Sequence, residues 1–287
     1  MITEFAPAKI NLALHVTGQR NDGYHLLDSL VVFADVGDRL AFQPSDTRRL
    51  TITGPFSDGV PTGPDNLIWK AVDWFDPTLQ LDITLEKTLP HAAGIGGGSA
   101  DAGAVIRALR QWRPGGPDNG GLVALGADVP VCTLGVTSRM GGIGEDLRPV
   151  PRLPPLPAVI VNPRALVPTA KVFSGLNRKD NSPMSMPDYG IGDRESFIHW
   201  LSAQRNDLEK PALTFQPLVR DVLSELTAQM GCALSRMSGS GATCFGLFPE
   251  IDAAKNAARR IAASHSDWWV QVTTLADHDA PGFGTQT

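Results

Sequence analysis

The chain has 287 residues, of which 42% are apolar and 19% charged, with a mean hydropathy of −0.06. These values are typical of a globular protein that buries a sizeable core, and the length suits one large or two ordinary domains. The formal net charge is −5 and no run of Lys or Arg exceeds a pair. Because binding a phosphate backbone needs a concentrated basic face, the composition argues against a nucleic-acid-binding protein.

The cysteines and the N-terminal sequence indicate the compartment. Cys132, Cys232 and Cys244 form no C-x-x-C pair, which argues against a disulfide framework and a zinc site and favours a reducing environment. No apolar stretch approaches the roughly 20 residues that span a bilayer, and the first residues lack the basic and apolar regions of a leader. We therefore expect a cytoplasmic protein with no membrane partner.

Hydrophobic periodicity predicts strands and two helices in the first half. Residues 10–16 alternate apolar and polar side chains, residues 26–36 form a second extended apolar segment, and residues 79–85 alternate again. Asp65 and Asn66 precede apolar residues at helical spacing, which predicts a capped helix. A second helix is expected from about Ser99 to Trp112, ending before Pro114.

A proline-rich segment divides the chain. Residues 149–157 contain five prolines, which favour a linker or a domain entry over a sheet interior. We therefore predict two domains, residues 1–150 and 151–287. The second half is expected to hold a strand at 158–161, helices near 194–204, 215–229 and 252–263, a further strand between the last two, and an irregular tail from Asp277. Strands interleaved with helices in both halves predict an α/β or α+β protein, and we expect an α+β (α/β two-layer) arrangement.

A glycine-rich segment is the strongest local feature. Residues 89–102 read Leu-Pro-His-Ala-Ala-Gly-Ile-Gly-Gly-Gly-Ser-Ala-Asp-Ala, between a predicted strand and a predicted helix. Glycines allow a phosphate to approach the backbone, and the N-terminus of the helix adds free N–H groups and the positive end of a dipole. The segment predicts an anion site suited to ATP phosphates, in which Ser99 caps the helix, contacts a phosphate or holds Mg²⁺. A flexible turn with a helix cap is the alternative.

Familiar nucleotide motifs are missing. Ser99 stands where the dinucleotide fingerprint needs Gly or Ala, no Gly-Lys-Ser/Thr occurs, and neither His-Arg-Asp nor Asp-Phe-Gly is found. A second small-residue cluster, Met237-Ser-Gly-Ser-Gly-Ala-Thr243, follows a strand-like segment. It is compatible with a hairpin or a bulge, or with a second surface on the same phosphates.

Phosphoryl transfer also requires a charge that offsets the developing anion and a group that accepts a proton. Lys9 begins the first strong strand and offers the charge. Asp128 lies among apolar neighbours before a proline, at an expected helix-to-strand corner, and offers the base. A lysine beside this carboxylate would keep it ionised and lower the pKa of the acceptor hydroxyl. Sequence spacing alone does not show that the two residues meet.

Together these motifs resemble one family, the 4-diphosphocytidyl-2-C-methyl-D-erythritol kinases of the non-mevalonate isoprenoid pathway, within the GHMP kinase superfamily. The similarity extends from residue 7 to about residue 247. The glycine motifs indicate the superfamily, and the segment Asp22-Gly23-Tyr24-His25 points to the cytidyl substrate. The motifs are Pro7-Ala8-Lys9-Ile10-Asn11-Leu12, Arg20-x-Asp22-Gly23-Tyr24-His25, residues 89–102, Leu125-Gly126-Ala127-Asp128-Val129-Pro130 and residues 237–243.

The resemblance implies a GHMP kinase fold, with an N-terminal ATP-binding domain, a C-terminal substrate domain and an active site in the cleft between them. It implies ATP and Mg²⁺ as cofactors and a small-molecule acceptor, phosphorylated on its 2-hydroxyl. Lys9 and Asp128 correspond to the catalytic pair, and the metal ligand is open, with Ser99 a candidate. The implied ATP contacts are Asn66, Pro90, Gly94, Ile95, Gly96, Gly97, Gly98, Ser99 and Ala100. The implied acceptor contacts are Asn11, Tyr24, His25, Asp128, Phe173 and Gly239, with Tyr24 and Phe173 on the two faces of the cytosine and His25 at its edge.

The sequence departs from the family pattern at two places. Residues 111–121 are short and rich in Gly and Pro where a longer helical hairpin is expected, and Gly103 replaces an alanine. Inside a helix this glycine costs about 0.5–1 kcal/mol. Two alternatives stay open: a GHMP kinase for homoserine, mevalonate or a sugar, and a non-catalytic nucleotide-binding module. The absence of a heptad or an apolar stripe leaves a monomer or a weak homodimer.

Overall fold

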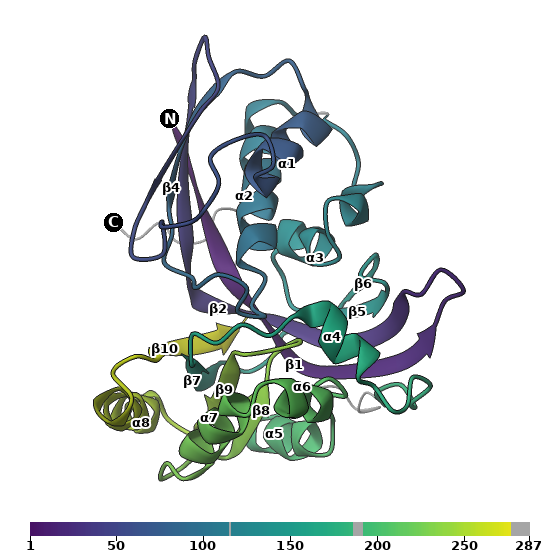
Figure 1. The fold of residues 1–287 in the computed structure, drawn as a ribbon, viewed down its shortest axis with the longest axis vertical. Coiled ribbons are helices and arrows are strands. Elements are labelled where there is room, and N and C mark those ends of the chain that lie inside the picture. The colour runs from purple at the N-terminus through teal and green to yellow at the C-terminus, as the bar shows by residue number, and fades with distance from the viewer. Residues whose placement is uncertain (115, 186–191, 277–287) are drawn as a thin grey trace.

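The computed structural model describes residues 1–114, 116–185 and 192–276. Over these ranges one mixed sheet extends through both halves, and helices pack against it (Figure 1). This confirms the predicted α+β class. The strands are β1 (Ile2–Gln19), β2 (His25–Pro44), β3 (Arg49–Thr53), β4 (Leu81–Glu86), β5 (Ser138–Gly142), β6 (Asp146–Pro149), β7 (Leu156–Asn162), β8 (Leu234–Met237), β9 (Cys244–Leu247) and β10 (Trp269–Ala276). The helices are α1 (Leu67–Phe75), α2 (Gly97–Trp112), the 3-10 turn η1 (Leu122–Ala124), α3 (Val129–Leu134), α4 (Thr169–Ser174), α5 (Arg194–Ser202), α6 (Glu209–Phe215), α7 (Leu218–Thr227) and α8 (Ile251–Ser264).

The long antiparallel pair β1–β2 joins the two halves of the molecule. Its register runs from Ile2 opposite Phe42 to Gln19 opposite His25, with irregularities that let the pair bend. The path through the sheet is β3-β4-β2-β10-β7-β9-β8, so β10 of the second half lies between β2 and β7. Only residues 150–155 of the proline-rich segment separate β6 from β7. Pro157 was wrongly excluded from the sheet interior, because it belongs to β7, which lies between β10 and β9 and pairs there with Thr274. The division at residue 150 stays a prediction.

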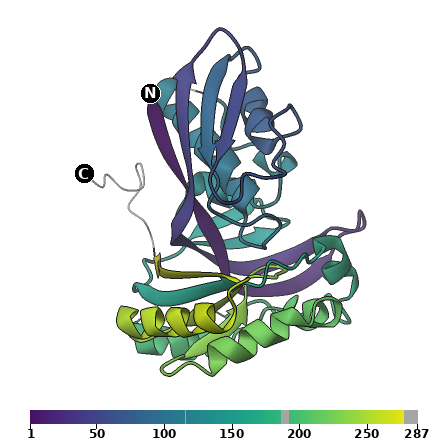
Figure 2. The same ribbon diagram turned by 60° about the vertical axis from the view of Figure 1, so that its left-hand side comes forward.

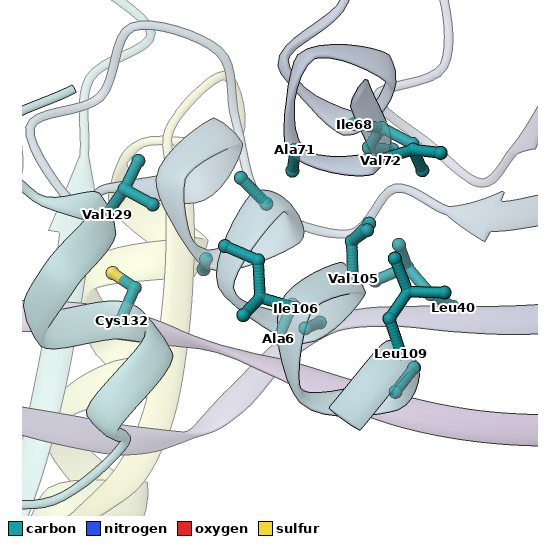
Figure 3. Close-up of a cluster of buried hydrophobic side chains, with 14 of the residues drawn as sticks. Ala6, Leu40, Ile68, Ala71, Val72, Val105, Ile106, Leu109, Val129 and Cys132 are labelled. Atoms are coloured by element: carbon teal, nitrogen blue, oxygen red, sulfur yellow. The ribbon is translucent and has the colours of Figure 1, made fainter. Parts of the chain in front are cut away.

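In the first half, α1 and α2 cover one face of β1–β4 (Figure 2). The alternation in β4 buries Leu81, Ile83 and Leu85 in the same cluster as these helices. Ile68 and Val72 of α1 point toward Val105 and Leu109 of α2, and all four side chains belong to one buried apolar cluster (Figure 3). This packing fixes the N-terminal end of α2, where the glycine-rich segment meets the helix.

In the second half, helices cover the lower part of the sheet, seen as the green helices of Figure 2. Val159 and Val161 of β7 share a cluster with apolar residues of α6, α7 and α8. The predicted helices near 194–204, 215–229 and 252–263 are confirmed as α5, α7 and α8, and the predicted strand at 158–161 as β7. The tail from Asp277 lies outside the described residues.

Two local predictions were wrong. Asp128 does not lie at a helix-to-strand corner, because it is the N-cap of α3, with Pro130 in the first turn of that helix, where a missing N–H costs nothing. Ser99 does not cap α2, because the helix begins two residues earlier and Gly96, in the left-handed region at φ 66°, is its N-cap. The short helices α3, α4 and α6 were not predicted.

Gly103 has a packing role. A Cβ placed on it would lie 2.7 Å from the carbonyl carbon and oxygen of Cys132 and 2.9 Å from the backbone nitrogen of Thr133. These distances are shorter than real Cβ contacts, so α2 and α3 approach each other too closely for an alanine. The departure from the expected alanine therefore brings α3, and Asp128 at its start, against α2.

Candidate active site

A cavity of about 410 Å³ lies where the glycine-rich segment, β1, the start of α3 and the β8–β9 loop meet. Most of the predicted site residues line it, although they come from distant parts of the chain. Its lining includes Lys9, Asn11, Leu67, Ala92, Gly94, Gly96, Gly97, Gly98, Ser99, Ala127, Asp128, Val167, Thr169, Phe173, Gly239 and Ser240. We refer to residues 90–96, which lie between β4 and α2 and end immediately before the first residue of α2, as the glycine loop.

Lys9 and Asp128 are in direct contact. The Nζ of Lys9 lies 3.0 Å from Oδ2 of Asp128, and the two side chains are 4% and 30% exposed. The backbone of Lys9 donates to the carbonyl of Ile95 at 2.9 Å, which ties β1 to the glycine loop. The backbone of the lysine is therefore fixed by the glycine loop, while the carboxylate of Asp128 stays accessible from the cavity.

Asn11 orients the lysine. Its Oδ1 accepts from Lys9 Nζ at 2.9 Å, and its Nδ2 donates to Ser29 Oγ at 2.7 Å. Ser29 Oγ donates in turn to the carbonyl of Ala13 at 2.7 Å, which fixes the direction of the chain of bonds. The Asn11 oxygen thus faces the lysine and the Nζ points into the cavity region between Asn11 and Asp128.

The glycine loop presents the start of α2 to the cavity. Gly94 and Gly96 have φ values of 74° and 66°, a region that suits glycine and lets the chain turn directly into the helix. The first turn of a helix leaves N–H groups without intrahelical partners, and Gly97, Gly98 and Ser99 occupy this turn and line the cavity. Together with the helix dipole these groups form an anion-binding surface.

The second small-residue cluster is the turn of the β8–β9 hairpin, and it also packs on the glycine loop. A Cβ on Gly94 would lie 2.4 Å from the carbonyl oxygen of Gly241, so the two backbones touch. Thr243 Oγ1 donates to the carbonyl of Ala93 at 2.6 Å. Gly239 and the neighbouring Ser240 line the cavity. Residues 237–243 therefore form a hairpin turn, and this turn is also placed where it could contact a ligand in the cavity.

His25 and Phe173 form an aromatic pair at one end of the site. Their ring centroids are 4.9 Å apart and the rings are stacked. Burial, helped by the charge of Lys179, holds the pKa of His25 below its usual value, so the ring is neutral near pH 7. Its Nε2 is buried without a hydrogen-bond partner among the described residues. Phe173 lines the cavity, whereas neither His25 nor Tyr24 does, and Tyr24 is 61% exposed at the β1–β2 turn.

Four of the expected ATP contacts lie behind the cavity surface. Pro90, Ile95 and Ala100 are buried and do not line it. Asn66 caps α1, as predicted: its Oδ1 accepts from the N–H of Ile68 at 2.9 Å, and its Nδ2 donates to the carbonyl of Pro61. The cavity wall next to this cap is Leu67.

Sequence reasoning missed several polar residues at the site. Thr169 and Ser240 join their hydroxyls at 2.9 Å across the cavity wall, and Thr169 lies in the same short segment as Phe173. Lys87, Asp38 and Asp101 form a buried ion cluster beneath the glycine loop. Burial raises the pKa of Asp101 to about 7, against the opposing charge of Lys87. Of these three residues, only Asp101 belongs to a segment that the sequence analysis had singled out, the glycine-rich segment 89–102.

A magnesium ion fits the donor set that the cavity offers. The described residues contain no group of three His, Cys, Asp or Glu side chains placed to hold a metal. Mg²⁺ bound with ATP needs only one or two protein oxygens, because phosphate oxygens and water complete its shell. The Ser99 hydroxyl, beside the anion-binding N–H groups, meets this requirement.

Among the residues that the structure describes, none of the helices has the length and apolar character of a membrane span.

Comparison with known proteins agrees with this geometry. The family model of the GHMP kinases N terminal domain matches residues 66–143, and that of the GHMP kinases C terminal domain matches residues 189–267. The two models lie on either side of the proline-rich segment. The fold and the site therefore define a GHMP kinase.

Close relatives specify the branch of this superfamily. A 4-diphosphocytidyl-2-C-methyl-D-erythritol kinase of Dinoroseobacter shibae is 55% identical over 275 residues, covering 96% of this chain and 95% of the relative. One of Jannaschia sp. is 52% identical, covering 93% and 94%. A crystal structure of 4-(cytidine 5′-diphospho)-2C-methyl-D-erythritol kinase superposes with a TM-score of 0.78 at 34% identity, over 96% of this chain and 99% of that one. The chain belongs to the 4-diphosphocytidyl-2-C-methyl-D-erythritol kinase family.

Proposed function

We propose that the protein transfers the γ-phosphoryl group of ATP to the 2-hydroxyl of 4-diphosphocytidyl-2-C-methyl-D-erythritol, giving the 2-phosphate and ADP, in the non-mevalonate isoprenoid pathway. Membership of the kinase family supports the reaction. The single observation that carries the chemistry is the Lys9–Asp128 pair, held in the cavity that the anion-binding start of α2 also lines. A module that only bound ATP would need no such base.

Asp128 acts as the base in this reaction. Its carboxylate accepts the proton of the 2-hydroxyl, while the hydroxyl oxygen forms a bond to the γ-phosphorus and the bond from that phosphorus to the β–γ bridging oxygen breaks, releasing ADP. Lys9 lies 3.0 Å from the carboxylate and is fixed by Asn11. Its ammonium stabilises the carboxylate and the negative charge that spreads over the transferred group.

The glycine loop and the first turn of α2 bind the triphosphate. Gly97, Gly98 and Ser99 line the cavity in the first turn of α2, where the N–H groups lack intrahelical acceptors that phosphate oxygens can replace. The Ser99 hydroxyl would hold a Mg²⁺ ion together with the phosphate oxygens, and this ion would neutralise phosphate charge. Gly94 and Gly239 allow the two loops to approach each other and the ligand closely.

The acceptor is held at the end of the cavity that Phe173 lines, where the His25 ring stacks on Phe173. The rings of Phe173 and the exposed Tyr24 supply stacking area for cytosine. The neutral His25, with its unpaired buried nitrogen, supplies a polar group for the edge of the base. Because His25 covers a face of Phe173 here, a base that stacks on that face must displace the imidazole. Asn11 and Gly239 border the reacting hydroxyl beside Asp128.

A substrate panel tests this function. Purified protein with ATP and Mg²⁺ is supplied with the cytidyl-diphosphate alcohol, homoserine, mevalonate or no acceptor, and ADP release is measured. We expect release only with the cytidyl substrate. Release with homoserine or mevalonate would keep the superfamily and remove Tyr24 and His25 from their proposed roles. ATP binding without release would favour a non-catalytic module.

We further propose that the protein works in a reducing, cytoplasmic compartment as a monomer or a weak homodimer. Its cysteines, Cys132, Cys232 and Cys244, are all free. Its exposed large apolar side chains come from separate turns and helix ends, including Tyr24 and Met230. Sedimentation at micromolar concentration tests the oligomeric state, and a stable larger assembly would contradict it.

A further inference from the structure

A buried ion cluster lies beneath the glycine loop, and the reaction proposed above gives it no role. Its members, Lys87, Asp38 and Asp101, are each less than 5% exposed, at 4%, 0% and 4%. The Nζ of Lys87 donates to the carboxylate of Asp38 and, at 2.7 Å, to Oδ2 of Asp101. Burying three charged groups opposes folding unless they are closely paired. The position of the cluster therefore calls for an explanation.

The two carboxylates hold opposite ends of the glycine loop. Asp38, in β2, accepts through Oδ1 from the N–H groups of Thr88 at 2.6 Å and Leu89 at 2.9 Å, the residues that lead into the loop. Asp101 belongs to α2, the helix at which the loop ends. Lys87 joins both carboxylates, so one ammonium fixes the entry of the loop relative to its exit.

The ammonium of Lys87 also lies directly under the first turn of α2. A Cβ placed on Gly97, the first residue of the helix, would lie 3.3 Å from Lys87 Nζ. Burial alone lowers the pKa of Lys87, but the charges of Asp101 and Asp38 outweigh burial and raise this pKa above its usual value. The lysine therefore stays charged beneath the first turn of α2 and keeps both carboxylates bound there.

We propose that Lys87 is a positioning residue for ATP: through Asp38 and Asp101 it holds the two ends of the glycine loop at the separation at which the N–H groups of α2 converge on the phosphates. This inference rests on the proposed function, because it takes ATP as the ligand of the loop. The expected cytosine contacts, His25 and Phe173, come from other elements, so the effect falls on the nucleotide and spares the acceptor.

Two substitutions of Asp101 test the link to the helix. Asp101→Leu leaves Lys87 and Asp38 as a charge-balanced pair but cuts the connection to α2, whereas Asp101→Asn keeps an oxygen that accepts from Lys87. Because misplacing a binding group by about 1 Å costs up to ~100-fold, we expect Asp101→Leu to raise the KM for ATP, and the Kd of a non-hydrolysable ATP analogue, by about tenfold or more. The KM for the acceptor should change by less than about twofold. In Asp101→Asn, the KM for ATP and the Kd of the analogue should return to near the values of the unchanged protein.

A matched pair separates positioning from a general loss of stability. Lys87→Met breaks the cluster, and Glu4→Gln weakens another buried ion pair on the same helix, with Arg107, more than two turns from the glycine loop. Both should lower the thermal unfolding temperature, but only Lys87→Met should weaken nucleotide binding. If Asp101→Leu does not fold, Asp101→Ser, which is too short to reach Lys87, replaces it.

Nucleotide binding is measured by calorimetry without acceptor, so the result does not depend on which alcohol is phosphorylated. Failure of the substrate panel with intact nucleotide binding would overturn the proposed function and leave this inference testable. An equal nucleotide Kd in the Leu and Asn variants of Asp101 would overturn the inference itself. A parallel rise in the KM for ATP and the KM for the acceptor would also overturn it. The same holds if Glu4→Gln weakens nucleotide binding as much as Lys87→Met does.

Discussion

At the residue scale, the site depends on a few side chains whose neighbours define their chemistry. Lys9 is almost fully buried and meets two groups, the carboxylate of Asp128 and the amide oxygen of Asn11. His25 is neutral because burial and Lys179 disfavour its charged form. The Lys9–Asp128 contact and the effect of Lys179 on His25 join segments that are remote in sequence, and each can be tested by a single substitution.

Asp128→Asn removes the base while keeping the shape of the side chain. We expect kcat to fall by about 10²–10⁴-fold, the usual contribution of a general base. Binding of a non-hydrolysable ATP analogue should be nearly unchanged, because the N–H groups that we propose to bind the phosphates belong to α2. Steady-state kinetics together with calorimetry check both parts, and a normal kcat would exclude Asp128 as the base.

Tyr24→Ala tests the stacking face for cytosine. Tyr24 is 61% exposed, so its removal should leave the unfolding temperature unchanged. Stacking of a base on an aromatic side chain contributes about 1–3 kcal/mol, so the KM for the acceptor should rise by about 5- to 150-fold while the KM for ATP changes little. Leu166→Ala, at a side chain that is 71% exposed, is the control. Equal changes in both KM values would remove Tyr24 from the acceptor site.

At the element scale, the placement of α2 against its neighbours decides the geometry of the site. The first turn of α2 carries the anion-binding groups, while its middle packs against α3, which begins at Asp128. Gly103 permits this contact. The glycine that weakens α2 as an isolated helix therefore permits the packing that places Asp128, the proposed base, beside the helix proposed to bind the phosphates.

Gly103→Ala should destabilise the protein although alanine is the better helix former. The gain in helix propensity is at most about 1 kcal/mol, whereas forcing a methyl group against the Cys132 carbonyl at 2.7 Å should cost about 1–3 kcal/mol. Gly98→Ala, in the same helix but with no atom within 4 Å of the added Cβ, should be neutral or stabilising. Urea unfolding of the two variants compares them directly, and a more stable Gly103→Ala variant would contradict the packing argument.

At the scale of the whole molecule, β1 holds the two halves together through polar contacts as well as sheet pairing. The His15 ring lies between two segments of the second half: its Nδ1 lies 3.1 Å from the carbonyl of Ser182, and its Nε2 accepts from the N–H of Arg205 at 3.1 Å. This arrangement requires a neutral ring protonated on Nδ1. Burial, reinforced by the charge of Arg205, lowers the pKa of His15, despite the opposing effect of Asp207 and Asp28.

The neutral His15 predicts how stability depends on pH. The folded pKa lies below the unfolded value of 6.5, so the unfolded chain binds more protons and the free energy of unfolding falls as pH decreases from about 6.5 toward the folded pKa. His15→Gln, which keeps a donor and an acceptor but does not titrate, should flatten this dependence between about pH 7 and 5. Urea unfolding at several pH values measures both slopes, and parallel curves would show that His15 does not contribute.

The sequence by itself determined most elements and the class of chemistry, because these depend on local patterns. Alternation predicted β4 and part of β1, the Asn66 cap predicted the start of α1, and the glycine-rich motif predicted an anion site at a helix N-terminus. Short helices such as α3 escaped prediction, because one or two turns carry too little periodicity and are stabilised mainly by packing.

Only the tertiary structure decided which distant side chains meet. The contacts of Lys9 with Asp128, of His25 with Phe173 and of Gly94 with the β8–β9 turn join segments more than 100 residues apart. The bent β1–β2 pair and the close packing of α2 on α3 bring these segments together. Local sequence patterns cannot predict these long-range contacts, because the contacts follow from burying the apolar faces of both halves against one continuous sheet.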